Sequence, residues 1–308
     1  IDDQASSGLT AEFLDGVNAS SIVPSIVDEM PAGGMAAILA DPETRSQHVD
    51  VLVEVARDLD VTGLDLDYEQ FAFADGSDTW EATRPNWVAF VEELAEALHD
   101  DGRTLTVSIP GIWNLTDDGV SGYWVYDHGA IAEHVDAIRI MAYDYSVAEP
   151  GPIAPPFWVA DVVSAVSQVV AQEHHDKLVL GVPAYGVNWV ESTLGECPTS
   201  AEGRAAVTAR SAGELALRRG GVPELDPATS EWSFRYALNV DDGTTSCVQN
   251  RVVRWVDSEG VAERVMIARQ AGWGGVALWA LGYDDPELWD AFVDAARRDL
   301  TPPATAPG

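Results

Sequence analysis

Residues 63–69 read Gly-Leu-Asp-Leu-Asp-Tyr-Glu, with an acidic residue at every second position of a short apolar run. Alternate side chains of a β-strand share a face, so Asp65, Asp67 and Glu69 are expected to point to one side of it. Three crowded carboxylates cannot all ionise easily, which predicts a raised pKa for at least one of them. Glu69 is the best candidate for a general acid, because it lies last on the strand. The alternative is an edge strand with a solvated acidic face, but the aromatic segment 70–76 that follows argues against it.

Short apolar runs rich in β-formers alternate with amphipathic helical patterns along most of the chain. The expected strands are 21–28, 61–67, 104–110, 135–143, 177–183 and 274–280. Between them, segments 45–59 and 87–99 place apolar residues on one helical stripe. This alternation predicts an α/β protein built from repeated β-α units around a parallel sheet.

One region breaks this rhythm and predicts an inserted α+β subdomain over residues 186–262. Inside it, strand patterns at 231–238 and 251–256 flank the turn-forming sequence Asp-Asp-Gly, which indicates a hairpin. The units before and after it are then 1–185 and 263–300, the latter holding the last strand and helix. Residues 301–308 (Thr-Pro-Pro-Ala-Thr-Ala-Pro-Gly) have the composition of a linker.

The composition predicts a soluble globular protein of strongly acidic character. The 308 residues include 17 basic and 51 acidic side chains, a formal charge of −34. Such a charge excludes a nucleic-acid binder that relies on phosphate contacts. No segment is long and apolar enough to predict a membrane span. We therefore expect a protein, most simply a monomer, with neither nucleic acid nor membrane as a partner.

The two cysteines, Cys197 and Cys247, favour a disulfide over two free thiols. Both lie in polar, turn-rich surroundings, and neither has the spacing of a zinc site. If the bond forms, it closes a loop of about 50 residues and points to an oxidising compartment. The protein is therefore expected to be secreted or located at the cell surface.

Three motifs in order along the chain resemble glycoside hydrolase family 18, the chitinase family. Asp65, Asp67 and Glu69 match the last three acidic positions of its DGxDxDxE strand. Residues 141–144 (Met-Ala-Tyr-Asp) match its MxYD motif, and Trp279 matches the tryptophan of its final strand. The insertion and the Gly-Val-Pro-Ala-Tyr-Gly strand look most like the bacterial branch that contains spore-cortex and cell-wall hydrolases.

The resemblance implies a TIM (β/α)8-type barrel, with two departures. Thr62 stands where the family has the first aspartate of the motif. The Asp-rich strand, fourth in the family, is only the second expected here, so we expect the first two β-α units to be missing from this chain. Six expected strands would leave a barrel of this kind incomplete.

The resemblance also implies a retaining, substrate-assisted mechanism for cleaving β-1,4 bonds next to N-acetylglucosamine. Glu69 would act as general acid and then base, and Asp67 would orient the substrate's acetamido group as its oxygen attacks the anomeric carbon. Asp65 would hold or share a proton with Asp67, while Tyr143 and Asp144 would contact the acetamido group. No metal or organic cofactor is implied.

Further residues are expected to bind the sugar. Trp279 would form the floor of the site, and Met141 shares a strand face with the tyrosine of the MxYD motif. Tyr185 ends another strand at the same rim, with Trp189 as a further candidate, although core packing is an equal alternative for both. The expected substrate is an N-acetylglucosamine-containing polysaccharide, either chitin oligomers or peptidoglycan. The competing function is a non-catalytic, chitinase-like carbohydrate-binding protein, against which the presence of Glu69 argues.

Overall fold

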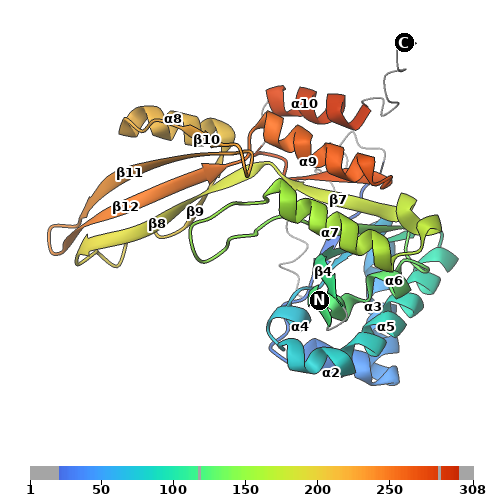
Figure 1. The fold of residues 1–308 in the computed structure, drawn as a ribbon. Coiled ribbons are helices and arrows are strands. Elements are labelled where there is room, and N and C mark those ends of the chain that lie inside the picture. The colour runs from blue at the N-terminus through green and yellow to red at the C-terminus, as the bar shows by residue number, and fades with distance from the viewer. Residues whose placement is uncertain (1–20, 117–118, 284–285, 298–308) are drawn as a thin grey trace, which may run out of the picture.

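A computed structural model describes residues 21–116, 119–283 and 286–297 of the chain, and the expected tail at 301–308 lies outside them. Its central element is a six-stranded parallel sheet in the order β1-β2-β3-β6-β7-β13 (Figure 1). The strands are β1 (Ser25–Val27), β2 (Gly63–Asp67), β3 (Thr104–Pro110), β6 (Ala137–Met141), β7 (Leu178–Pro183) and β13 (Gly275–Trp279). Each of the six expected strands is therefore confirmed, with ends shortened by up to four residues.

Helices pack around this sheet and against one another. They are α2 (Gly34–Ala40), α3 (Pro42–Asp58), α4 (Gln70–Phe73), α5 (Trp80–Asp100), α6 (His128–Ile131), α7 (Pro156–Val169), α9 (Ser258–Gln270) and α10 (Pro286–Arg297). Helix α10 lies on α9 rather than on the sheet (Figure 1). Helix α3 begins where the Asp41 side chain accepts hydrogen bonds from two backbone N–H groups, followed by proline at the first helical position. Its expected stripe (Val49, Leu52, Val53, Ala56) is buried, as is that of α5 (Trp87, Phe90, Val91, Leu94).

The TIM-type barrel implied by the resemblance is not confirmed, because the described residues form no closed barrel. Strands β1 and β13 are the two edges of the sheet, and no pairing joins them within those residues. Closure of a TIM barrel takes eight tilted strands, and the six present here leave the sheet open. The Asp-rich strand β2 is second in the sheet, as the sequence predicts, and pairs in parallel with β1 and β3.

A second, antiparallel sheet extends away from the first (Figure 1). Its order is β10-β11-β12-β8-β9, and α8 (Ala209–Arg219) packs on it. The strands are β8 (Tyr185–Gly195), β9 (Ala205–Thr208), β10 (Glu224–Asp226), β11 (Glu231–Asp241) and β12 (Ser246–Trp255). The predicted hairpin is confirmed as β11–β12, longer than expected, with Asp241 opposite Ser246 at its tip. A shorter antiparallel pair, β4 (Ile112–Thr116) and β5 (Gly119–Gly122), follows β3.

The predicted disulfide between Cys197 and Cys247 is present and joins the loop after β8 to strand β12. The bond spans 50 residues of sequence, so it removes much of the loop entropy of the unfolded second sheet.

Replacing Cys247 by serine is expected to destabilise the second sheet by about 2–4 kcal/mol. Thermal unfolding of the variant and of the oxidised parent would measure the difference. Reduction with dithiothreitol is the control. It should lower the unfolding temperature of the parent to that of the variant and leave the unfolding temperature of the variant unchanged. Equal transitions for the oxidised parent and the variant would contradict the prediction.

Within the described part of the chain, no helix has the length and apolar character needed to cross a membrane.

Candidate active site

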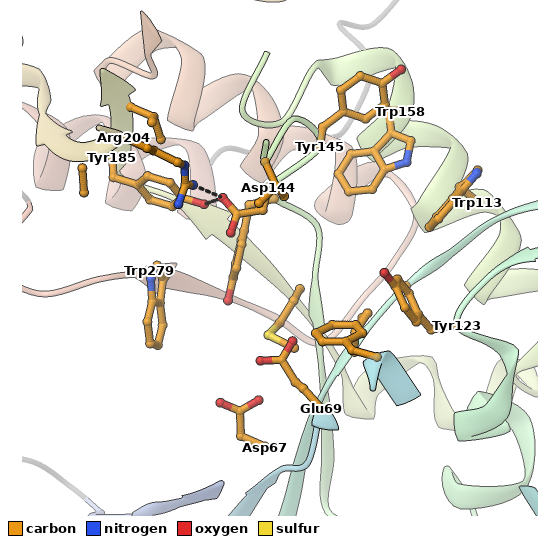
Figure 2. Close-up of a pocket in the computed structure, with 18 of the residues that line it drawn as sticks. Asp67, Glu69, Trp113, Tyr123, Asp144, Tyr145, Trp158, Tyr185, Arg204 and Trp279 are labelled. Atoms are coloured by element: carbon orange, nitrogen blue, oxygen red, sulfur yellow. Dashed lines mark hydrogen bonds and ion pairs between the residues drawn. The ribbon is translucent and has the colours of Figure 1, made fainter. Parts of the chain in front are cut away.

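A cavity of about 1050 Å³ opens at the carboxyl ends of the central strands. Seven of the eight residues predicted for catalysis or sugar binding line it, and they come from segments up to 212 positions apart: Asp67, Glu69, Met141, Tyr143, Asp144, Tyr185 and Trp279. In Figure 2 the carboxylates of Asp67 and Glu69 point into the space beside the ring of Trp279. The eighth residue, Asp65, lies beneath the cavity and is 1% exposed.

The two carboxylates in the cavity occupy the end of β2 and the residue just before α4. Burial, the nearby Asp67 and then Asp144 raise the pKa of Glu69 to about 7. Burial and the charge of Asp65 raise the pKa of Asp67 to about 6, while Arg139 opposes that rise. Glu69 can therefore hold a proton near neutral pH, as the crowding of the acids predicts. It lies two residues beyond the end of β2, and not last on the strand as expected.

The backbone between these two acids is held by buried aromatic groups. The carbonyl oxygen of Tyr68 accepts a hydrogen bond of 2.8 Å from the hydroxyl of Tyr126. The Tyr68 side chain faces away from the cavity, where its hydroxyl lies 2.9 Å from Nε2 of His48. Fixing Tyr68 fixes the spacing of the carboxylates on either side of it, which favours a preorganised site.

Asp65 is bound by a polar network of its own. Its Oδ2 forms a 2.8 Å ion pair with Nη1 of Arg139 and accepts a 2.6 Å hydrogen bond from Ser25. Ser108 donates to the same carboxylate at 2.9 Å. Oδ1 of Asp67, in contrast, is buried without a hydrogen-bond partner among the described residues. The proton sharing between Asp65 and Asp67 implied by the resemblance therefore stays a prediction.

Arg139 and Ser108 are site residues that the sequence reasoning missed. Arg139 lies on β6 two positions before Met141, on the same strand face, and it is the one charge in the run Ala-Ile-Arg-Ile-Met. A charge inside a buried strand was the signal that could have identified it, because such a group needs a partner. Ser108 carried no comparable signal.

A second polar group lies across the cavity from the two acids (Figure 2). The hydroxyl of Tyr185 donates a 2.5 Å hydrogen bond to Oδ1 of Asp144, whose backbone adopts φ 55°. Arg204, in the loop just before β9, lies 3.7 Å from the same oxygen. Trp279 stacks near Tyr143, with ring centroids 6.4 Å apart and planes 23° from parallel. Burial, followed by nearby carboxylates, raises the pKa of the Tyr143 hydroxyl, which therefore remains a donor.

The cavity is lined by a glutamate with a raised pKa, by an aspartate whose Oδ1 has no hydrogen-bond partner among the described residues, and by the exposed ring of Trp279. Residues 25–284 match the model of the family described as glycosyl hydrolases family 18. The chain belongs to this family. It is 28% identical over 171 residues to the putative sporulation-specific glycosylase YdhD of Bacillus subtilis, a stretch that covers 53% of this chain and 37% of YdhD. The chain thus spans little more than a third of that relative's length.

Two chitinases extend the comparison within family 18. The class V chitinase of Arabidopsis thaliana is 24% identical over 309 residues, covering 89% of this chain and 76% of that protein. The crystal structure of a chitinase from Chromobacterium violaceum superposes with a TM-score of 0.72 at 26% identity, covering 89% of this chain and 79% of the other. The family assigned from the three motifs is confirmed.

An aromatic wall faces the acids from the side opposite Trp279, and the sequence reasoning did not identify it (Figure 2). It contains Trp113 and Tyr123 beside the β4–β5 pair, together with Tyr145 and Trp158. The Trp113 and Trp158 rings lie 6.1 Å apart, centre to centre. Such faces pack against the apolar faces of sugar rings. They come from β4, α7 and two loops, whose meeting depends on the tertiary fold, so no local pattern marks them.

Trp189 does not belong to this site. It is 2% exposed, and its indole Nε1 donates a 3.1 Å hydrogen bond to the carbonyl of Val147. Of the two explanations considered for Trp189, core packing is the one that the structure supports. Tyr185, its companion candidate, lines the cavity.

Proposed function

We propose that this family 18 protein is a glycoside hydrolase that cleaves β-1,4 bonds next to N-acetylglucosamine with retention of configuration. The observation that carries the proposal is a Glu69 carboxyl with a pKa of about 7 in the same cavity as Asp67 and Trp279. A group that titrates near neutral pH can both donate and accept a proton during one catalytic cycle.

In the proposed mechanism, Glu69 donates its proton to the glycosidic oxygen as that bond breaks. The oxygen of the substrate's own acetamido group bonds to the anomeric carbon, forming an oxazolinium ion. Asp67 faces that group and stabilises its positive charge, while Tyr143 and Asp144 hold it in place. Glu69 then takes a proton from a water molecule, whose oxygen attacks the anomeric carbon and opens the oxazolinium ring. The water attacks from the face that the departed sugar occupied.

Several broader features belong to the same proposal. Residues 186–262 form an inserted subdomain between the parts of the chain at 1–185 and 263–300. The Cys197–Cys247 disulfide supports a secreted or cell-surface protein, since such bonds persist in oxidising compartments. We expect a monomer whose partner is a polysaccharide containing N-acetylglucosamine.

A pair of matched substrates tests the mechanism. The protein is expected to release products from N-acetyl-chitooligosaccharides and to leave the fully de-N-acetylated oligomers intact, because these lack the attacking oxygen. Proton NMR of the first product should show the β-anomer before mutarotation. An initial α-anomer would overturn retention. Binding of the oligosaccharides with no cleavage would instead favour the non-catalytic carbohydrate-binding alternative.

The pH dependence of kcat/KM is expected to be a narrow bell on a neutral substrate. Activity should fall above a pKa of about 7, where Glu69 loses the proton that it must donate. It should also fall below a pKa of about 6, where Asp67 gains a proton and loses its charge. Initial rates on an N-acetyl-chitooligosaccharide from pH 4 to pH 10 would give both apparent pKa values. These values belong to the interacting pair of acids and not to either residue alone. Full activity at pH 9 would contradict the role of Glu69.

A further inference from the structure

The cavity has one positively charged wall residue in an otherwise acidic setting. Among the described residues that line it, Arg204 is the only cation, whereas Asp67, Glu69 and Asp144 are acids. The whole chain carries a formal charge of −34. An anionic substrate would therefore be repelled at long range and would find one complementary group inside the cavity.

Arg204 is held in place by a buried support. It follows Glu202 and Gly203, whose carbonyl oxygens accept hydrogen bonds from the guanidinium of Arg251. Arg251 is 1% exposed, and the amide of Gln249 also donates to the Glu202 carbonyl. Because the buried guanidinium of Arg251 donates hydrogen bonds to these loop carbonyls, it holds the segment before β9 against the second sheet. The cation at its end is therefore positioned before any ligand arrives.

Within the described part of the chain, the guanidinium of Arg204 donates no hydrogen bond, so its donors are open to a ligand. Its side chain is 43% exposed, and its contact with Oδ1 of Asp144 is 3.7 Å, longer than a hydrogen bond. The same oxygen already accepts the 2.5 Å hydrogen bond of Tyr185. A guanidinium carries five N–H donors in a planar fork that matches the two oxygens of a carboxylate.

We propose that Arg204 is a specificity-determining residue that binds a carboxylate substituent on the sugar chain. The inference rests on the proposed glycosidase function and names its substrate class: N-acetylhexosamine polymers that bear carboxylates, such as peptidoglycan strands whose lactyl groups are free of peptide. Neutral chitin oligomers would lack the partner of Arg204. The guanidinium offsets the repulsion that the acidic cavity exerts on such strands.

The test compares three substrates of similar length: peptide-free peptidoglycan strands, the same strands with methyl-esterified lactyl groups, and N-acetyl-chitooligosaccharides. The parent is expected to show a kcat/KM at least about 10-fold higher on the free acid than on the ester, the size of one charged hydrogen bond. Arg204→Gln should abolish that preference, because kcat/KM should fall more on the free acid than on the ester or the chitooligosaccharides. Arg204→Lys should retain part of it. Arg210→Gln, an exposed arginine on α8 that does not line the cavity, is the matched control and should behave as the parent.

An equal loss by Arg204→Gln on all three substrates would overturn the inference, because Arg204 would then act through Asp144. A binding measurement separates this outcome from failure of the proposed function. Calorimetric titration of Glu69→Gln, with and without Arg204→Gln, uses the same strands and needs no turnover. An Arg204-dependent preference for the free acid would support the inference even if the parent cleaved nothing. No difference between the two proteins would overturn it.

Discussion

Replacing Glu69 by glutamine is expected to lower kcat/KM on the cleaved substrate by at least about 100-fold, the usual contribution of a general acid. Glutamine keeps the shape of the side chain, but it has no proton to give to the glycosidic oxygen. Product release from N-acetyl-chitooligosaccharides and from peptidoglycan, followed for parent and variant, measures the loss. The exposed Glu92 of α5 offers a matched control, since Glu92→Gln should keep full activity.

The same variant should be at least as stable as the parent at alkaline pH. The pKa of Glu69 is raised in the folded protein, so the unfolded chain loses its proton first as pH increases. Stability from this group is present at low pH and is lost as pH rises through about 7. Glutamine does not ionise, so the variant does not lose this stability as pH rises. The melting temperature of Glu69→Gln should therefore exceed that of the parent at pH 8 and converge with it near pH 4. A lower melting temperature at pH 8 would show that the substitution damages the fold.

Replacing Arg264 by methionine is expected to cost about 3–5 kcal/mol of unfolding free energy, the penalty for breaking a buried ion pair. Arg264 of α9 and Glu231 of β11 form a 3.3 Å ion pair, and both side chains are 0% exposed. The guanidinium also donates to the carbonyls of Ala154, Gly260 and Thr229. Without it, a buried carboxylate and several carbonyls lose their partner. Burial already raises the pKa of Glu231, so the variant should relieve part of the cost by protonating it.

Urea unfolding measures this loss, and an exposed arginine supplies the comparison. Arg218 on α8 is 62% exposed and pairs with Glu214 one helical turn away. Arg218→Met should change the unfolding free energy by no more than about 0.5 kcal/mol, as surface pairs usually do. The loss in Arg264→Met should also be smaller at low pH than at pH 8, because protonation removes the unpaired charge. Similar losses for the two variants would contradict the buried-pair explanation.

The Glu231–Arg264 pair also connects the second sheet to the wall of the cavity. Glu231 accepts hydrogen bonds of 2.9 Å from the backbone N–H groups of Ile153 and Ala154. The carbonyl of Ile153 in turn accepts from the N–H of Tyr145, a residue of the aromatic wall. No sequence motif indicates this connection, because Glu231 lies 33 positions from Arg264 and 78 positions from Ile153.

The sequence by itself determined the strands, the helical stripes and the acids on β2. These features depend on local periodicity: the alternation of Asp65 and Asp67 with Leu64 and Leu66 specifies two faces whatever the rest of the chain does. The confirmed disulfide likewise followed from the surroundings of two cysteines. The family was readable because its motifs are short and occur in order.

Only the tertiary structure decided how the sheet ends and what surrounds the acids. Strand pairing shows an open sheet where the resemblance implied a barrel. The partners of Asp65, including Arg139 74 positions away, depend on which strands become neighbours. Arg204 lines the cavity, and its loop is held by hydrogen bonds from Arg251 of the second sheet. Such contacts join residues far apart in sequence, and their positions depend on the packing of whole elements, which no local pattern records.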